Sequence, residues 1–497
     1  MKLGSVFGMV FNLACTVTVG AVIVASVSCG RQPSSGTTDQ RQTARPNILL
    51  ISIDTLRADH LGTYGYSRNT SPAIDAFARS SHVYSNAFAP SPWTLPSHAG
   101  MLTGAHPFDI GIHHWNSSLP ENVPTMAAIL NADGYQTAAF VDSGIEGFVG
   151  GGRGFARGFE AYHHAPFRDD LDVKYDIAVS TELASSWLNA RDDDRPFFLF
   201  LHTKSVHALP HDSPCLDHRC FPYDKPEPFR FRFVDEEQAR FTWSDAEKGF
   251  GQAYLWSWNR TILSGKEDPK AFPASELHVL KGLYDGGVAY TDAFVGQLLS
   301  HLAALKLLEN TLVIITSDHG EAFLEHNLFM HQEVYEQLLH VPLIVKLPGA
   351  DRGNEISELV SILDIAPTVL RTAGIVPPSS MAGRALPLEP VVSHENRWLF
   401  GYYLCPPSFN YKAFTVFNND WKLVRHNFEN VDQYADEFYT VQRGRHEARQ
   451  SDLANEALIV LRHRLELRTQ NEPKITPTLI QPSIETLELL KTIGYID

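Results

Sequence analysis

The chain has 497 residues, of which 44% are hydrophobic and 20% charged, a balance that excludes a disordered or fibrous protein. The formal net charge of −16 argues against nucleic acid as a partner, because phosphate contacts need clustered Lys and Arg. The length allows one large hydrophobic core and a smaller second unit.

The N-terminal segment indicates export. Residues 6–27 follow Lys2 as a mainly apolar stretch without charge, which predicts a signal peptide over residues 1–28 or a single membrane anchor. Small residues precede Cys29, as at a bacterial lipoprotein cleavage site. We therefore expect a periplasmic or cell-envelope protein that meets the membrane only through this anchor or lipid, and lipidation at Cys29 stays open beside plain cleavage. Residues 29–45 are polar and predict a flexible tether.

Apolar runs of strand length alternate with helix-period segments from residue 46 to about residue 374. This alternation predicts an α/β fold, with a mostly parallel sheet and helices on both of its faces. The expected strands cover residues 48–53, 136–140, 197–202, 312–316 and 343–346. The expected helices begin at Pro72 or cover residues 125–133, 275–305 and 364–373.

Two regions depart from this alternation. Residues 211–273 are polar and rich in aromatic residues and Pro, which predicts a loop-rich insertion within a main domain of residues 46–390. Cys215 and Cys220 in this insertion predict a small disulfide loop. The alternative is an accessory metal site that would use His211, Asp217 and His218. Short strands at 399–402, 414–416 and 422–425 and a helix at 453–468 predict a small α+β C-terminal subdomain over residues 391–497.

Acidic residues follow two of the predicted parallel strands. Asp54 follows strand 48–53, and Asp318-His319 follows strand 312–316. Ligands of open parallel sheets bind beyond the carboxyl ends of the strands, so these residues are expected at one edge. Two carboxylates and an imidazole suit a divalent metal ion. The alternative is that each Asp only caps the following helix.

A hydroxyl residue precedes another predicted helix. Pro96 suits the first helical turn, so Thr94 is expected close to unpaired backbone N–H groups and the positive end of the helix dipole, where anions bind. The alternative is that Thr94 is only an N-cap.

These segments together resemble the sulfatase family of the alkaline-phosphatase-like superfamily, over about residues 46–386 and residues 490–496. Residues 46–62 resemble the family's first metal motif, and residues 317–321 resemble the second. The slots of the nucleophile signature hold Thr94, Pro96, His98 and Thr103-Gly104. Further similar segments are 197–207, His326, His331, 341–343, 364–368 and 383–384. The resemblance implies the family fold, metal-dependent cleavage of an ester, and a substrate-contacting histidine at His207.

The sequence also departs from the family pattern. The family nucleophile is a Cys or Ser oxidised to formylglycine, whereas Thr94 carries a methyl group on Cβ and cannot yield that aldehyde. The signature Arg is His98, and the usual second aspartate of the first motif is Thr55. The segment that brings a sulfate-binding Lys in many sulfatases is missing around residues 140–144.

The resemblance to superfamily phosphodiesterases and phosphoglycerol transferases, which use a Thr nucleophile, suggests a hypothesis for the chemistry. Thr94 would attack phosphorus while bound to one divalent metal ion, with Asp54, Asp318 and His319 as the other ligands. The imidazole ligand favours Mn²⁺ or Zn²⁺, with Ca²⁺ possible.

Three histidines complete the expected site. His207, His331 and His98 would hold the anion or protonate the leaving group, although a structural role for His98 is equally open. The substrate would be an anionic ester of a glycan, a lipid headgroup or a small molecule. Two other functions stay open: sulfuric ester hydrolysis by family membership, and an inactive sulfatase-like binding protein.

Overall fold

The structure is a computed structural model of the whole chain. It describes residues 45–143, 145, 147–164, 176–191, 195–208, 221–243, 251–263, 272–390, 397–404, 411–428, 435–442, 445–450, 456–470, 478–479, 484 and 487. The predicted signal peptide, Cys29, the Cys215–Cys220 pair and the alternative metal site beside that pair lie outside these residues. Within them, the structure holds no helix with both the length and the apolar character needed to cross a bilayer.

The central feature is an eight-stranded sheet with the strand order β12-β2-β11-β8-β1-β7-β5-β6. Five of its seven pairings are parallel, and β11 runs antiparallel to both of its neighbours. The predicted mostly parallel α/β sheet is therefore confirmed. Its strands are β1 (Asn47–Ile53), β2 (His82–Tyr84), β5 (Gln136–Val141), β6 (Ala161–His164), β7 (Phe197–Thr203), β8 (Thr311–Thr316), β11 (Leu343–Lys346) and β12 (Glu355–Ile356).

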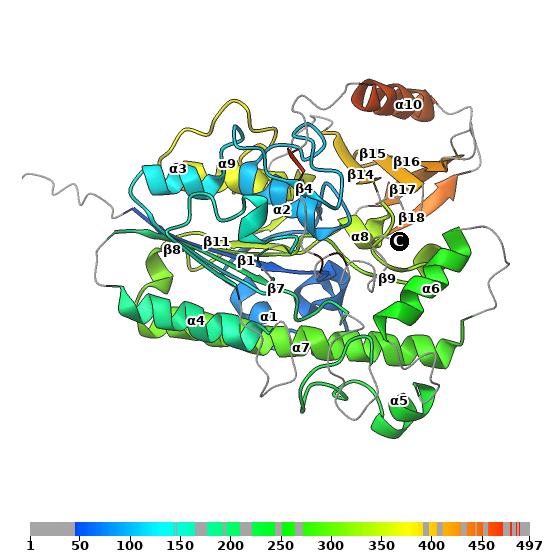
Figure 1. Cartoon of the computed structure of the whole chain (residues 1–497), viewed down its shortest axis with the longest axis horizontal. Coiled ribbons are helices and arrows are strands. Elements are labelled where there is room, and N and C mark those ends of the chain that lie inside the picture. Colours follow the sequence, from blue (N-terminus) through cyan, green and yellow to red (C-terminus); the bar gives the residue numbers. More distant parts are fainter. Residues whose placement is uncertain are drawn as a thin grey trace, which may run out of the picture. The chain divides into compact units, whose positions relative to one another are not determined.

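Helices cover both faces of this sheet (Figure 1). One layer contains α1 (Pro72–Ala78), α4 (Ile177–Ala190) and the long α7 (Ala274–Ala304), which contacts the other two. The other layer contains α2 (Thr94–Thr103), α3 (Met126–Ala132) and α9 (Ile365–Thr372), which contact one another. Because both faces are covered, every residue of β1, β7 and β8 is buried, which explains their continuous apolar runs.

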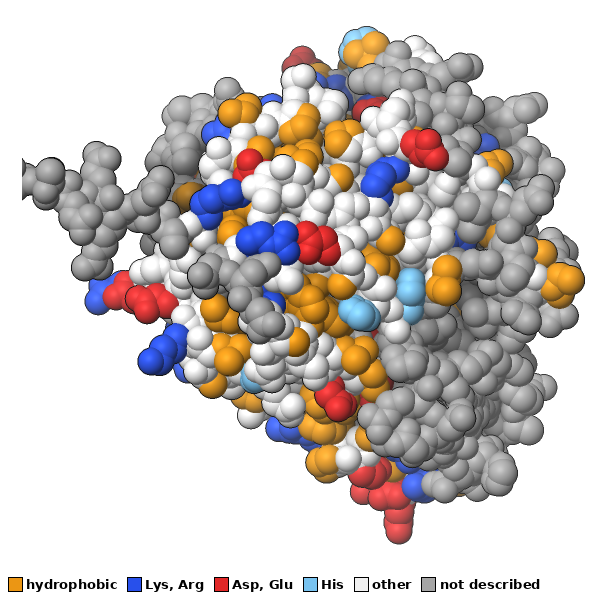
Figure 2. Space-filling view, turned by 60° about the vertical axis from the view of Figure 1, so that its left-hand side comes forward, with side chains coloured by type: hydrophobic (Ala, Val, Ile, Leu, Met, Phe, Trp, Pro, Cys, Tyr) orange, Lys and Arg blue, Asp and Glu red, His pale blue; other side chains and the backbone are white. Residues whose placement is uncertain are grey.

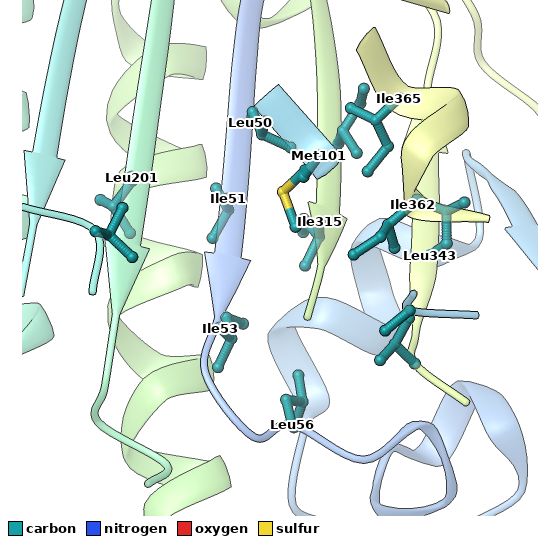
Figure 3. Packing of buried hydrophobic residues seen from close by; sticks show 14 of the residues in the cluster. Leu50, Ile51, Ile53, Leu56, Met101, Leu201, Ile315, Leu343, Ile362 and Ile365 are labelled. Carbon is teal, nitrogen blue, oxygen red and sulfur yellow. The ribbon is translucent and has the colours of Figure 1, made fainter. Parts of the chain in front are cut away.

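The core between the sheet and the second layer fixes the position of α2. Figure 3 shows Met101 of α2 among Leu50 of β1, Ile315 of β8 and Ile365 of α9. All ten residues of α2 are buried, and the helix ends at Gly104, whose φ of 64° is a left-handed conformation that suits glycine. This packing holds the first residue of α2 over the end of β1.

The C-terminal subdomain consists of a five-stranded antiparallel sheet covered by one helix, as Figure 1 shows. Val416, Leu423 and Phe438 of the sheet pack with Leu458 and Leu461 of the helix in a separate small core. The elements are β14 (Leu399–Leu404), β15 (Tyr411–Phe417), β16 (Trp421–Phe428), β17 (Ala435–Gln442), β18 (Arg445–Gln450) and α10 (Glu456–Thr469).

Several elements differ from the sequence prediction. The insertion expected to be rich in loops contains α5 (Glu236–Thr242) and α6 (Gln252–Leu263). The predicted helix 364–373 is confirmed as α9, and a short turn, η7 (Ile362–Asp364), precedes it. The remaining short elements are β3 (Ala87–Phe88), β4 (Ser117–Ser118), β9 (Ala322–Phe323), β10 (Phe329–Met330), β13 (Val360–Ser361), β19 (Thr478–Leu479), α8 (Glu336–Leu339), η1 (Ala58–His60), η2 (Gly62–Tyr64), η3 (Gly151–Arg153), η5 (Leu308–Asn310) and η6 (Glu325–Asn327).

One face of the surface carries both signs of charge. Figure 2 shows basic and acidic side chains interspersed among apolar and neutral ones, so the described part of this face has no broad patch of one sign.

Candidate active site

The candidate site lies where three neighbouring parallel strands end. In the sheet β1 is flanked by β8 and β7, so Asp54 follows the central strand and Asp318 follows its neighbour. The Asp54 N–H donates to the carbonyl of Thr203 at the end of β7 (2.9 Å), which ties these two strand ends together. The convergence that parallel pairing predicted for Asp54, Asp318 and His319 is present, and all three residues are fully buried.

A left-handed turn links the two metal motifs. Thr55 has a φ of 60°, and in this conformation its N–H donates to Asp318 Oδ1 (3.3 Å). The Thr55 hydroxyl donates to the carbonyl of Asp54 (2.7 Å), so it points into the backbone. Neither aspartate caps a regular helix, since Asp318 Oδ1 accepts from Thr55 and from the His319 N–H (3.0 Å).

Thr94 is the first residue of α2, and its hydroxyl contacts side chains outside this helix. The N-cap position belongs to Trp93, so the alternative that Thr94 is only an N-cap is wrong. Thr94 Oγ1 donates instead to Asp54 Oδ2 (3.3 Å) and lies 3.5 Å from His319 Nε2. The hydroxyl therefore faces the two metal motifs.

Four side chains surround a point that a cation would fit. His319 Nε2 lies 3.5 Å from Asp54 Oδ1 and 3.4 Å from Asp318 Oδ2, and neither carboxylate oxygen has a hydrogen-bond partner. Ligand atoms that each lie about 2.1 Å from one ion are roughly 3.0–3.5 Å apart. These separations, and the Thr94 contacts, therefore fit ligands of one shared ion better than hydrogen bonds.

The protonation of His319 also suits a ligand. Its Nδ1 lies 3.0 Å from the carbonyl of Gly320, which can only accept, so Nδ1 carries the proton and the Nε2 lone pair faces the carboxylates. Burial and the neighbouring His331 lower the pKa of His319 well below its ordinary value, which keeps the imidazole neutral. Neutral imidazole is the form that binds metal ions.

The two aspartates do not readily carry two negative charges side by side. Burial and the negative charge of Asp54 raise the pKa of Asp318 well above its ordinary value. Burial acts in the same sense on Asp54, but the hydrogen bond from His202 and the neighbouring His207, His319 and Lys204 outweigh it and lower the pKa of Asp54. A divalent cation would stabilise the second charge.

His331 and His207 lie next to this cluster. The ring centroid of His331 is 4.6 Å from that of His319 and 5.1 Å from that of His207, so the three imidazoles form a row. Burial lowers the pKa of both His207 and His331 to about 4, and both rings are therefore neutral near pH 7. His326 lies apart from this row, since its ring stacks on Tyr335 with centroids 3.5 Å apart.

His98 is bound on both ring nitrogens. Its Nδ1 donates to the carbonyl of Thr94 (2.9 Å), and its Nε2 lies 2.9 Å from Ser52 Oγ. Because Nδ1 must carry the proton, this nitrogen cannot also coordinate a metal ion. The ring connects the first turn of α2 to β1 beneath the site.

Two further residues near the site were not among the predicted site residues. His202 of β7 is fully buried, has no hydrogen bond on either ring nitrogen, and places Nε2 3.6 Å from Asp54 Oδ2. Lys204 follows β7, and its charge contributes to lowering the pKa of Asp54. Lys204 Nζ lies 5.9 Å from the centroid of the Phe148 ring, which packs edge-on against Trp93 beside Thr94. Both residues lie at the carboxyl end of β7, and their position at this end of the strand is the sequence feature that could have identified them as site residues.

Comparison with known proteins assigns the family. The family model described as "Sulfatase" matches residues 46–375. The chain belongs to the sulfatase family. It is therefore a hydrolase of ester bonds in a metal-dependent family. A second model, "N-sulphoglucosamine sulphohydrolase, C-terminal", matches residues 324–470 and so includes most of the C-terminal subdomain.

Curated relatives include sulfatases from animals and bacteria. Arylsulfatase K of Bos taurus is 26% identical over 439 residues, which cover 81% of this chain and 79% of that protein. The ulvan-active sulfatase of Formosa agariphila is 27% identical over 370 residues, which cover 70% of this chain and 65% of that protein.

Two solved structures share the fold at lower identity. BT4656 in complex with its substrate D-glucosamine-2-N,6-O-disulfate has a TM-score of 0.63 and 21% identity, and the match covers 86% of this chain and 99% of that chain. The phosphonate monoester hydrolase of Silicibacter pomeroyi has a TM-score of 0.62 and 19% identity, with coverage of 86% and 96%. Both likenesses support the sulfatase-type α/β architecture.

Proposed function

We propose that this sulfatase-family chain cleaves a sulfate or phosphate ester with Thr94 as the nucleophile, and that phosphodiester hydrolysis or phosphoryl transfer is the favoured chemistry. The observation that carries the proposal is the direction of the Thr94 hydroxyl, which faces Asp54 and His319 instead of capping its own helix. A threonine kept only for helix capping would have no reason to point there.

The choice of phosphorus follows from what Thr94 lacks. Formylglycine hydrate has a second hydroxyl through which sulfate can be expelled, whereas an esterified threonine has none. An ester of Thr94 must instead be attacked by a second nucleophile, and phosphorus accepts such an attack. Water as that nucleophile gives hydrolysis, and an alcohol gives transfer.

We assign Asp54, Asp318, His319 and the Thr94 hydroxyl as ligands of one divalent metal ion, with Mn²⁺ or Zn²⁺ favoured. When bound, such an ion lowers the pKa of a hydroxyl and neutralises charge on an ester oxygen. The two unpaired carboxylate oxygens and the free Nε2 lone pair support this assignment.

The chain's own residues can accept and donate the protons that the first chemical step requires. The Thr94 oxygen forms a bond to phosphorus and its proton passes to Asp54 Oδ2, which already accepts its hydrogen bond. The bond from phosphorus to the leaving oxygen breaks, and His207 or His331 gives that oxygen a proton. The anionic substrate raises the pKa of these buried imidazoles on binding, which allows them to carry the proton.

The second step reverses these transfers. A water oxygen attacks phosphorus and gives a proton back to the histidine. The bond from phosphorus to Thr94 then breaks, and the threonine oxygen recovers its proton from Asp54. His98 has a positioning role in this proposal, because it holds the carbonyl of Thr94 and thereby the first turn of α2.

We further propose an exported enzyme that acts on a glycan-linked ester, with periplasmic or envelope location and lipidation at Cys29 as open possibilities. The apolar N-terminal stretch supports export. Relatives named for ulvan and for a glucosamine disulfate support a glycan. An ester of a lipid headgroup or a small molecule stays as an alternative.

The test is a panel of aryl sulfate, phosphate monoester and phosphodiester substrates, assayed with added Mn²⁺ or Zn²⁺. Thr94→Val removes the hydroxyl and should abolish turnover, and radiolabelled phosphate should be found on Thr94 in the wild-type protein. Thr103→Val is the matched control, because it removes a buried hydroxyl at the other end of the same helix. Full activity of Thr94→Val would remove Thr94 from the mechanism.

Sulfuric ester hydrolysis is the second candidate, and the family assignment favours it. Turnover of the aryl sulfate alone, still abolished by Thr94→Val, would select this function. No turnover of any ester, together with no bound metal by elemental analysis, would select the inactive binding protein instead.

A further inference from the structure

A cavity lined by arginines and aromatic rings lies at the other end of α2 and differs in charge from the rest of this acidic protein. Its volume is about 470 Å³, and residues from the sulfatase-type domain and from the C-terminal subdomain line it. The side chains that matter for its chemistry are Arg384, Arg397, Arg464, Arg468, Trp398 and Phe400.

The lining of this cavity carries a positive excess. Its described lining residues include four arginines and one carboxylate, that of Asp109. Another cavity, of about 780 Å³, is lined by two arginines and four carboxylates and so has the opposite sign. The chain as a whole has a formal charge of −16, so four arginines around one small cavity are not an effect of composition.

Two of the guanidinium groups are held by acids. Arg397 makes a bidentate pair with the buried Asp364 (2.6 and 2.8 Å), and Arg468 pairs with Asp109. These pairs fix the positions of both guanidinium planes. Among the described residues, Asp109 and Asp364 are the carboxylates that pair with these two arginines, and the four arginines of the described lining outnumber them.

Aromatic rings orient the guanidinium groups further. Arg464 lies over the Trp398 ring at 4.4 Å, and Arg468 lies over the Phe400 ring at 5.0 Å. A guanidinium that stacks on a ring keeps its N–H groups at its edge, where they match the paired oxygens of sulfate, phosphate or carboxylate. Among the described residues Arg464 has no ion pair, and both Arg464 and Arg384 are exposed.

This cavity is separate from the candidate active site. Helix α2 has ten residues and is therefore about 15 Å long, with Thr94 at one end and His106, which lines the cavity, just past the other. One small ester cannot reach both places. A ligand of the cavity is therefore either a second molecule or a distant part of a polymer.

We propose that this arginine cavity is an accessory binding site for an oxyanion group carried by an anionic oligosaccharide. The oxyanion follows from the four arginines, and the oligosaccharide rests on the proposed function. Nucleic acid fits less well, because the rest of this chain is acidic and would repel a long polyphosphate.

The test compares binding of three probes to the full-length protein by calorimetry: a sulfated glucosamine oligosaccharide, the same chain without sulfate, and inorganic sulfate. The test variant is the pair Arg384→Gln and Arg464→Gln, which removes the two exposed cations. Arg371→Gln is the control, because it removes one exposed charge from α9, outside the cavity. Each binding reaction is repeated in Thr94→Val, which separates it from turnover.

The double variant should bind the sulfated oligosaccharide at least about tenfold more weakly and with a smaller dependence on salt, since each charge-assisted hydrogen bond contributes that much or more. The control should bind as the wild type does, and turnover of a small aryl ester should not change in the double variant.

Three results would overturn the proposal. Unchanged affinity of the double variant would remove the arginines from binding. Equal affinity for inorganic sulfate would leave an anion site without the oligosaccharide. Loss of turnover of the small ester would show that the cavity is not a separate site. Failure of the proposed function would give a different result, namely no turnover of any ester by the wild-type protein. The binding comparison could still be interpreted in that case.

Discussion

Asp142 gives a quantitative test of the buried polar network next to the site. It directly follows β5, is fully buried, and accepts hydrogen bonds from Ser180 Oγ, Thr203 Oγ1 (2.5 Å) and the Lys204 N–H (3.3 Å). Burial raises the pKa of Asp142 from 3.8 to about 7. The change to test is Asp142→Asn, because the amide resembles the protonated acid in shape and cannot ionise.

The sign of the effect follows from the direction of this pKa shift. The folded pKa lies above the unfolded pKa, so the stability that Asp142 contributes is complete below about pH 4 and is lost as the pH rises through about 7. As the pH rises from about 5 to about 8.5, the ionisation of Asp142 lowers the free energy of unfolding by roughly 3 kcal/mol. The Asn variant lacks this term, so its stability should fall less over that interval, by about the same amount.

The measurement is the free energy of unfolding in urea, followed by tryptophan fluorescence at both pH values with metal held saturating. Asp133→Asn is the control, because the side chain of Asp133 is 46% exposed and pairs with Arg45 at the surface. The control should lose as much stability between the two pH values as the wild type does. If Asp142→Asn also loses as much as the wild type, the reasoning from burial is refuted.

Three other predictions test the site and the backbone. Asp318→Asn should weaken binding of Mn²⁺ or Zn²⁺ to metal-stripped protein by more than about 100-fold in calorimetry, because loss of a ligand exceeds the 10–100-fold effect of outer partners; unchanged affinity would remove Asp318 from the metal site. Lys204→Met should raise the KM for an anionic ester by about 10–100-fold with little change in melting temperature, since a hydrogen bond to a charged group contributes about 1.5–3 kcal/mol. Lys306→Met, which changes an exposed lysine, should leave this KM unchanged. Gly158→Ala should lower the melting temperature far more than Gly134→Ala, although both glycines have positive φ (91° and 88°). A Cβ at Gly158 would lie 2.1 Å from the nitrogen of Ala128, whereas no atom lies within 4 Å of a Cβ at Gly134. Equal melting temperatures of the two variants would contradict the steric argument.

The strands that carry the metal motifs were predictable from the sequence for a physical reason. A strand covered on both faces must be largely apolar, so β1 and β8 appear as mainly apolar runs, and an aspartate within two positions of each run marks the end of the strand. By contrast, β17 and β18 have the sequences ADEFYTVQ and RHEARQ. Their polar sequences do not predict strands. Backbone pairing of β17 with β16 and of β18 with β17 nevertheless extends the sheet there.

The direction of the Thr94 side chain could not be predicted in the same way. Threonine is a common N-cap, so local preference alone supports capping as well as any other role. What decides is the tertiary packing of α2, which places the hydroxyl 3.3 Å from Asp54, a residue 40 positions earlier in the chain. His202 was not predicted as a site residue for a related reason, since its closeness to Asp54 depends on β7 pairing directly with β1.

The buried carboxylates connect the stability of this protein to its chemistry. Asp54 and Asp318 are both fully buried and share His319 as a neighbour, and removal of two carboxylates from water is costly unless a cation or hydrogen bonds compensate. One oxygen of each carboxylate has no such bond. The same two atoms that would weaken the fold in the absence of a cation are therefore those that would hold it next to Thr94. In the proposed arrangement, the free energy of ion binding would stabilise the fold and would also hold Thr94 in position, because the Thr94 hydroxyl donates a hydrogen bond to one of those carboxylates.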